Sequence, residues 1–102
     1  IFINSVAGLQ AYPYSSAYVA SKFGLTGFSS SLREELRSEN IKVISVHPGS
    51  VDTSFWENSN ADFPREEMLL PEEIASSIIS AILAPNNLVY EKLVLRRTAG
   101  DF

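Results

Sequence analysis

The chain has 102 residues, of which 45% are hydrophobic and 20% are charged, a composition typical of an ordinary globular domain. Its formal net charge of -4 argues against a nucleic-acid partner, because such binding needs a basic patch. The absence of cysteine excludes disulfides and thiolate chemistry within the chain. No apolar run approaches the roughly 20 residues needed to cross a bilayer, so we expect no membrane partner.

The first predicted element is a short apolar strand, Ile1–Ile3, which Asn4 and Ser5 follow directly. Such a run is typical of a buried parallel strand. The chain therefore opens inside a strand-like run with no basic or signal-like segment before it. We expect this start to be a cut rather than a natural amino terminus.

A loop follows, with Gly8 and Pro13 as its turn residues. Tyr12 and Tyr14 flank the proline. Their rings are interpreted as cover for the mouth of the domain or, alternatively, as one wall of a substrate pocket, which aromatic side chains commonly line.

A long helix is predicted from Ser15 or Ser16 to Ser38, with a serine as its N-cap. Tyr18 and Lys22 are four residues apart, so they share one face of this helix. An ammonium beside a phenol favours the phenolate, which would lower the tyrosine pKa from about 10 toward a range useful for proton transfer. Taken alone, Tyr18 is better interpreted as a packed tyrosine and Lys22 as a solvent-exposed helix lysine.

Two further stripes run along this helix. One is apolar and the other consists of small residues, among them Gly24 and Gly27. Each of these glycines lowers helix stability by about 1 kcal/mol relative to alanine in a helix interior, which favours another helix packing against them. The apolar side consists of Tyr18, Phe23, Leu25, Phe28, Leu32 and Leu36, and the small-residue stripe consists of Ala20, Gly24, Gly27 and Ser31.

A second strand is predicted over Ile41–Val46, and His47-Pro48-Gly49 breaks it. His47 is the only histidine, so no histidine pair exists for a metal site, and we interpret it as a strand-end residue. No metal ligand set is expected elsewhere. Residues Ser50–Leu70 lack periodicity, and a segment of that length is usually a functional lid or disordered. Its aromatic residues, which include Phe55, Trp56 and Phe63, favour a lid.

A second helix is predicted to open at Pro71, followed by two acidic residues that suit a first turn, and to stop before Pro85. A last strand should lie within Leu88–Arg97. The order β-α-β-α-β predicts an α/β fold with three parallel strands. The predicted buried face of the second helix consists of Ile74, Ala75, Ile78, Ile79, Ile82 and Leu83.

Three features together resemble the short-chain dehydrogenase/reductase family in its classical form. Ser5 precedes Tyr18 by thirteen residues, Tyr18 and Lys22 form a Tyr-x-x-x-Lys pair, and the turn that begins at Pro48-Gly49 follows the next strand. The run Asn4-Ser5-Val6-Ala7-Gly8 also matches the family. The resemblance covers essentially the whole chain, but only the later part of the family's domain.

The resemblance implies a β-α-β-α-β portion of a Rossmann-like, doubly wound parallel sheet. Residues 1–102 would form a single partial domain. The family's nucleotide-binding first half, with its glycine-rich loop and a further catalytic asparagine, would be absent, and its strands would lie beside Ile1–Ile3.

The resemblance also implies the roles of three catalytic residues. Tyr18 would be the general acid/base, Lys22 would lower its pKa and hold the nicotinamide ribose, and Ser5 would hydrogen-bond the substrate oxygen. For Ser5, a strand-end serine that caps backbone groups is the alternative interpretation. The implied cofactor-binding residues are Tyr18, Lys22, Pro48, Gly49, Val51 and Thr53, and the candidate substrate-binding residues are Ser5, Tyr12, Tyr14, Phe55 and Trp56. Asp52 is interpreted as a turn or cap residue.

By resemblance, the function would be hydride transfer between NAD or NADP and a ketone or secondary alcohol, such as a 3-oxoacyl thioester or a small ketone. A cytoplasmic homo-oligomer, a dimer or tetramer, is expected. The alternative is a catalytically incompetent fragment that acts only in helix-mediated association, which the small-residue stripe and the opening of the chain suggest.

Overall fold

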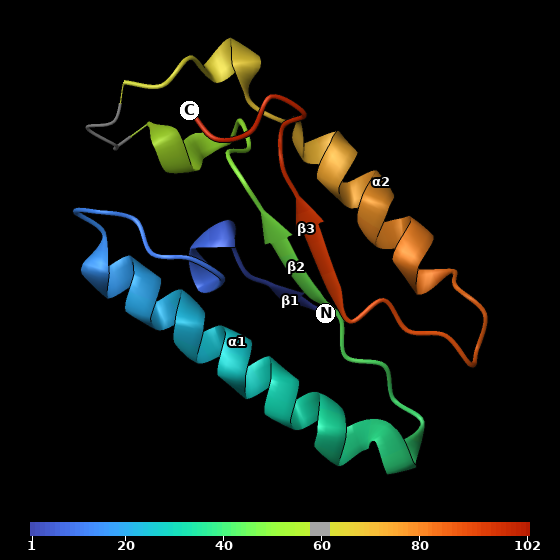
Figure 1. The fold of residues 1–102 in the computed structure, drawn as a ribbon. Helices are drawn as coiled ribbons and strands as arrows, with labels where there is room; N and C mark the ends of the chain where they lie inside the picture. The colour runs from blue at the N-terminus through green and yellow to red at the C-terminus, as the bar shows by residue number, and fades with distance from the viewer. Residues whose placement is uncertain (58–61) are drawn as a thin grey trace.

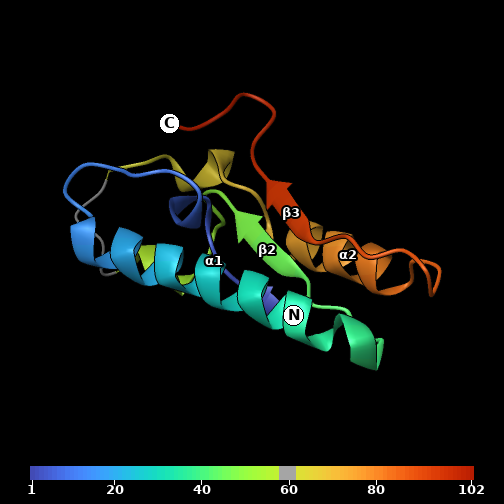
Figure 2. The ribbon, with the colours of Figure 1, turned by 60° about the horizontal axis from the view of Figure 1, so that its bottom comes forward.

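The computed structural model describes residues 1–57 and 62–102 and shows a three-layer α/β arrangement. Three parallel strands pair in the order β1-β2-β3. Helices α1 and α2 lie on opposite sides of this sheet (Figures 1 and 2). The predicted β-α-β-α-β order is confirmed. The bounds are β1 Phe2–Ile3, α1 Ser16–Leu36, β2 Ser45–Pro48, α2 Pro71–Ile82 and β3 Lys92–Leu95.

The face of the sheet toward α2 is apolar. Ile44 and Val46 are buried together with Ala81 of α2, because alternate residues of a strand point to the same face. Ile74 and Ile78 pack against this cluster from one side, and residues of β3 pack against it from the other. This cluster holds α2 on the sheet.

The face of the sheet toward α1 is polar. Ser29 of α1 contacts Ser45 of β2 through hydroxyl oxygens that are 2.8 Å apart. The buried side chain of Arg33 donates from Nε to the Val43 carbonyl at 2.9 Å and from Nη2 to the Glu91 carbonyl at 2.8 Å. Hydrogen bonds therefore hold α1 against the strands, whereas apolar packing holds α2 against them.

The predicted apolar side of α1 is left partly exposed by the described part of the chain. Phe23 is 45% exposed and Phe28 is 59% exposed, although Phe28 meets the ring of Phe2 edge-on at 5.7 Å. A Cβ added at Gly24 or Gly27 would meet nothing within 4 Å. The apolar pattern marks a face correctly, but no other element in the described part of the chain covers it.

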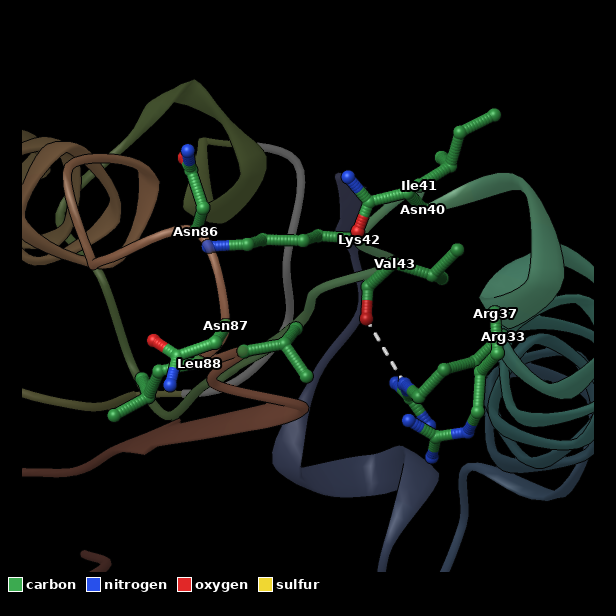
Figure 3. Close-up of a pocket in the computed structure, with 10 residues that line it drawn as sticks. Arg33, Arg37, Asn40, Ile41, Lys42, Val43, Asn86, Asn87 and Leu88 are labelled. Carbon is green, nitrogen blue, oxygen red and sulfur yellow. Dashed lines mark hydrogen bonds between the residues drawn. The ribbon is translucent and has the colours of Figure 1, made fainter.

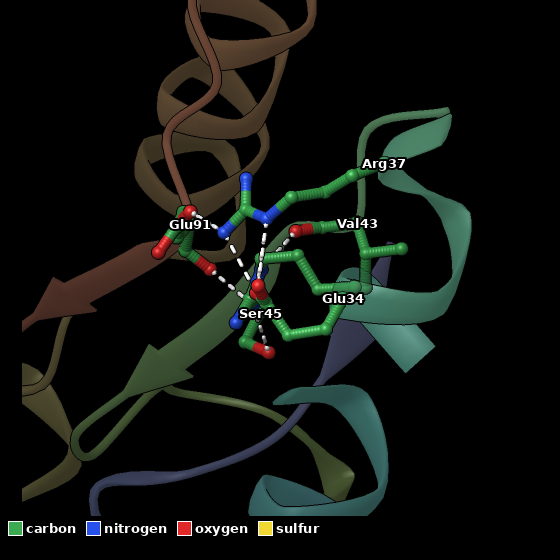
Figure 4. A network of polar contacts seen from close by, with 6 residues as sticks. Glu34, Arg37, Val43, Ser45 and Glu91 are labelled. Carbon is green, nitrogen blue, oxygen red and sulfur yellow. Dashed lines mark hydrogen bonds and ion pairs between the residues drawn. The ribbon is translucent and has the colours of Figure 1, made fainter. Parts of the chain in front are cut away.

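An exposed network of ion pairs lies at the carboxyl-terminal end of α1 (Figure 4). Arg37 pairs with Glu34 one turn earlier at 2.7 Å and with Glu91, which precedes β3, at 2.6 Å. The hydrogen bond from Arg37 holds the pKa of the Glu34 carboxyl below its usual range. The network links the end of α1 to the entry of β3.

The bounds of α1 match the prediction, and those of β2 are shifted. α1 is followed by a 3-10 turn, Arg37–Glu39, and Asn40 adopts a left-handed conformation with φ 56° that ends the helix. Ladder pairing in β2 begins at Ser45 rather than at Ile41. The first bond between β1 and this segment runs from the Phe2 N–H to the Ile44 carbonyl at 2.9 Å.

α2 begins at Pro71 as predicted, and the Glu73 carboxylate accepts a hydrogen bond from the Leu70 N–H at 2.8 Å. Its buried face is narrower than predicted. Ala75, Ile79, Ile82 and Leu83 are exposed, because β3 is the last strand of the described sheet and nothing beyond it covers them. Among the described residues, neither helix combines the length and hydrophobicity that a bilayer span requires.

The opposite edge of the sheet is β1. Ile1 is 54% exposed and Ile3 is 55% exposed, and β1 pairs with β2 alone in the described part of the chain. An apolar strand left open in this way is a surface for further pairing.

Candidate active site

The predicted catalytic residues lie at one edge of the sheet. Ser5 follows β1 and Gly49 follows β2, so both stand at the carboxyl ends of parallel strands. α1 begins at this same end, which places Tyr18 and Lys22 in its first two turns (Figure 1). In open α/β sheets this crevice beyond the strand ends is where ligands bind.

Ser5 caps a short turn and keeps a free donor. Its Oγ accepts a hydrogen bond from the N–H of Ala7 at 3.1 Å, at the start of the 3-10 turn Val6–Gly8. A hydroxyl has one donor and two acceptor sites, so this contact leaves the O–H available. Within the described residues the Ser5 O–H has no acceptor. The two sequence interpretations of Ser5 are therefore compatible, since one side chain can cap the turn and donate to a ligand.

Tyr18 and Lys22 lie together as their spacing predicts. The Lys22 ammonium stands 5.5 Å from the centroid of the Tyr18 ring, within the range of a cation–π contact. Tyr18 is 39% exposed, so its hydroxyl can be reached by a ligand. The Phe55 ring lies beside it, with centroids 6.0 Å apart.

Asn4 is a site residue that the sequence reasoning missed. It is buried, its Oδ1 accepts from the N–H of Ser5 at 2.8 Å, and its Nδ2 donates to the Thr26 hydroxyl at 2.9 Å and to the Lys22 carbonyl at 3.4 Å. Asn4 thus ties the Ser5 turn to the part of α1 that contains Lys22 and Thr26. A Cβ at Gly8 would stand 2.5 Å from Asn4 Oδ1, so only glycine fits beside this contact. The sequence feature that could have indicated Asn4 is its place in the run Asn4–Gly8, which matches the family.

The loop after β2 has free backbone donors. Gly49 donates to the Leu95 carbonyl at 2.8 Å, and Val51 forms a parallel bridge with Leu69 that closes the base of the long loop. In the parts of the chain that the structure describes, the N–H groups of Val51 and Thr53 have no acceptor. Two unpaired donors, in the loop whose Phe55 ring lies beside Tyr18, suit a ligand that carries an amide, as nicotinamide does.

Asp52 is engaged in an ion pair. Its carboxylate accepts from Arg65 Nε at 2.7 Å, and Arg65 also donates to the Thr53 carbonyl at 3.1 Å. The pair braces the loop, in keeping with a structural rather than an acid/base role for Asp52.

Tyr12 and Tyr14 lie in different surroundings. The half-buried Tyr12 donates from its hydroxyl to Asp101 at 2.9 Å, and burial together with this carboxylate raises its pKa. Tyr14 is fully exposed and adopts φ 61°. Tyr12 therefore fastens the loop to the carboxyl-terminal segment, while Tyr14 projects into solvent. A substrate-binding role for either stays a prediction.

Phe55 and Trp56 belong to a run of aromatic contacts, which we call the aromatic cluster: Tyr18, Phe55, Trp56, Phe63 and Phe102. Successive ring centroids are 5.2 to 6.0 Å apart. The Trp56 indole donates to the Val51 carbonyl at 3.0 Å, which fixes it to the loop after β2. Residues 58–61 of the predicted lid lie outside the described residues. The remainder forms 3-10 turns at Ser54–Trp56 and Arg65–Glu67.

His47 is fully buried at the end of β2. Its Nδ1 lies 2.9 Å from the carbonyl oxygen of Ser5. Burial lowers the pKa of its imidazole, against the opposing effect of the Ser5 contact, and the charges of Lys92 and Arg33 lower it further. His47 is therefore neutral near neutral pH and belongs to the packed strand end.

A polar hollow of about 200 Å³ lies at the other end of the sheet (Figure 3). Residues that precede β2 and β3 line it, together with the end of α1. Its cations are already engaged, because Lys42 donates to the Pro85 carbonyl at 2.8 Å and Arg37 pairs with two glutamates. The hollow is thus separate from the catalytic edge.

Residues 1–63 match the family model described as short chain dehydrogenase, a stretch that contains Ser5, Tyr18, Lys22 and the loop after β2. The chain belongs to the short-chain dehydrogenase family. This confirms the family that the motifs indicated.

Two relatives within the short-chain dehydrogenase family show how much of a whole protein is present. The chain is 39% identical over 100 residues to sepiapterin reductase of Chlorobaculum tepidum, covering 98% of the chain and 41% of the relative. It is 34% identical over 87 residues to the 3-oxoacyl-[acyl-carrier-protein] reductase FabG of Chlamydia trachomatis, covering 78% and 35%. The chain thus spans about two fifths or less of these relatives.

A solved structure confirms the fold. The alcohol dehydrogenase of the archaeon Thermococcus sibiricus, complexed with 5-hydroxy-NADP, aligns with a TM-score of 0.80 at 27% identity. The alignment covers 94% of this chain and 40% of that one. The Rossmann-like sheet is therefore established, whereas the catalytic roles of Ser5, Tyr18 and Lys22 stay predictions.

Proposed function

We propose that this chain is the catalytic, carboxyl-terminal part of an NAD(P)-dependent oxidoreductase acting on a ketone or secondary alcohol. The observation that carries the proposal is the meeting of three elements at one sheet edge. Asn4 ties the Ser5 turn to the backbone of Lys22, and Phe55 of the loop after β2 packs against Tyr18. The names of the two relatives, both reductases, support it.

The chemistry follows from the donors at this edge. A bound reduced nicotinamide supplies the hydride. Tyr18 gives its phenolic proton to the carbonyl oxygen of the ketone and takes a proton from the alcohol in the reverse direction. The free O–H of Ser5 donates to the same oxygen and stabilises the negative charge that develops there. The Lys22 ammonium offsets the charge left on Tyr18 and can donate to the ribose hydroxyls.

The loop after β2 is the proposed nicotinamide-binding segment. Its free N–H groups at Val51 and Thr53 suit the carboxamide. A Cβ added at Gly49 would meet the Leu95 carbonyl oxygen at 3.7 Å, which is ordinary contact, so the fold itself does not require glycine there. We infer that Gly49 leaves room for the cofactor.

This inference predicts the outcome of Gly49→Ala. The full-length protein should keep its melting temperature, because the fold has space for the methyl group, while the Kd for the nicotinamide cofactor rises by about tenfold or more through steric conflict. Fluorescence titration with NADH and NADPH measures the Kd. An unchanged Kd would contradict the assignment of this loop to the cofactor.

The substrate is proposed to have an apolar portion. Phe55 stands next to Tyr18 and Trp56 next to Phe55, and aromatic side chains commonly line such pockets. A small ketone like that reduced by a sepiapterin reductase, or a 3-oxoacyl thioester, fits this description. A panel of both kinds, assayed with NADH and NADPH, tests the proposal, and absence of turnover with every member would oppose it.

A second candidate function is association without catalysis. The exposed Phe23 and Phe28 and the uncovered Gly24 and Gly27 leave one face of α1 open to a second copy, as expected for a homo-oligomer. If association is the only function, sedimentation should show an oligomer and the substrate panel no turnover. A monomer would remove this candidate.

A further inference from the structure

The backbone ladder that supports the catalytic edge ends immediately before Ser5. Asn4 donates to the Val46 carbonyl at 2.7 Å, the last bond between β1 and β2. With Ile3 opposite Val46, the next bond of a parallel ladder would run from the N–H of residue 48 to the Asn4 carbonyl. Residue 48 is proline and has no N–H, so the ladder stops there. No main-chain hydrogen bond of the β1–β2 ladder therefore fixes Ser5.

The His47 side chain provides a hydrogen bond to the Ser5 backbone instead. Nδ1 of His47 lies 2.9 Å from the Ser5 carbonyl oxygen, and since a carbonyl only accepts, Nδ1 carries the proton. The imidazole is fully buried on the α1 side of β2. Its second nitrogen, Nε2, is buried without a partner among the described residues. A buried polar atom without a partner costs stability, and an apolar side chain would have no such atom. The one interaction that a histidine gains here is the hydrogen bond to Ser5.

Ser5 is held from its other side as well. Asn4 Oδ1 accepts from the Ser5 N–H at 2.8 Å, and the Ala7 N–H donates to the Ser5 hydroxyl at 3.1 Å. The His47 contact is the one that reaches Ser5 from a different strand, 42 residues away in the chain. It fixes the position of Ser5 relative to β2 and to the loop that follows it.

We propose that His47 is a positioning residue, which holds the Ser5 carbonyl so that the Ser5 hydroxyl points at the substrate oxygen. The proposal rests on the proposed function, because it gives Ser5 a ligand to meet. His47 itself touches neither substrate nor cofactor. A misplacement of a catalytic donor by about 1 Å can cost on the order of a hundredfold in rate, so one such bond has a measurable effect.

The test compares two substitutions in the full-length protein. His47→Asn places an amide N–H close to the position of Nδ1 and should keep most of the turnover. His47→Leu fills the space without a donor and should lower kcat by about ten- to a hundredfold, while the Kd for the cofactor stays unchanged. Ser45→Ala is the matched control, since Ser45 is buried on the same face of β2 and does not contact Ser5. It should leave kcat unaltered.

A double-mutant cycle decides whether His47 acts through Ser5. In a Ser5→Ala background, His47→Leu should cause little further loss of kcat. An equal loss in both backgrounds, or equal kcat for the Leu and Asn variants, would overturn the proposal. If the Leu variant does not fold, His47→Gln replaces it, because its amide lies too far along the side chain to reproduce the Nδ1 bond. Ser5→Ala alone tests the proposed function separately, since an unchanged kcat there removes Ser5 from the catalytic residues.

Discussion

Tyr18→Phe is expected to remove most of the turnover of the full-length protein and to leave cofactor binding intact. The substitution deletes one hydroxyl and keeps the ring, so the contacts with Phe55 and with the Lys22 ammonium persist. General acid/base catalysis typically contributes about a hundred- to ten-thousandfold, and kcat should fall by that order. Steady-state kinetics with a ketone, beside fluorescence titration with NADPH and NADH, give both quantities.

The matched control is Tyr90→Phe. Tyr90 is 47% exposed and precedes β3, at the end of the sheet away from Ser5, so losing its hydroxyl should not alter turnover. Equal kcat values for wild type and Tyr18→Phe would remove Tyr18 as the proton donor. A parallel loss of cofactor affinity would instead indicate a role in binding.

Arg33→Met is expected to produce the largest loss of stability. Methionine fills similar space but leaves the buried Val43 carbonyl without its donor and removes one of the two hydrogen bonds to the Glu91 carbonyl, which keeps the Ser45 N–H. An orphaned buried acceptor costs about 1–3 kcal/mol and the loss of a further hydrogen bond about 0.5–1.5 kcal/mol, so we expect the free energy of unfolding to fall by about 2–4 kcal/mol. Relief from burying a charge works in the other direction, but it does not supply the missing donors.

Urea unfolding of the full-length protein measures this loss. Arg37→Met is the control, since Arg37 lies four residues later, in the 3-10 turn that follows α1, and its ion pairs with Glu34 and Glu91 are exposed. Exposed pairs contribute little, so Arg37→Met should shift the unfolding midpoint only slightly. Similar midpoints for the two variants would show that the buried hydrogen bonds of Arg33 do not hold α1 to the sheet.

The sequence was sufficient for the features that depend on local spacing. The four-residue interval placed Tyr18 and Lys22 on one helix face, and the order of apolar runs predicted three parallel strands. Pro71 and the acids after it located the start of α2. Each of these signals lies within a few residues of the feature that it predicts.

Features that depend on distant partners could not be predicted in this way. Arg33 reads as a surface charge, yet it is buried because it meets backbone carbonyls 10 and 58 residues away. The contact between His47 and Ser5 spans 42 residues. The apolar residues of α2 were located, but its buried face was predicted too broad, because periodicity shows that a face is apolar and does not show what lies against it.

The central claim is that this catalytic edge transfers hydride between a nicotinamide and a carbonyl carbon. The most direct measurement uses NADH or NADPH that carries deuterium at the reactive carbon of the nicotinamide, incubated with the full-length protein and a ketone. The account predicts an alcohol product with deuterium on its carbinol carbon, formed at least about a hundredfold more slowly by the Tyr18→Phe variant. An alcohol without the label, or no oxidation of either cofactor with any ketone of the panel, would contradict it.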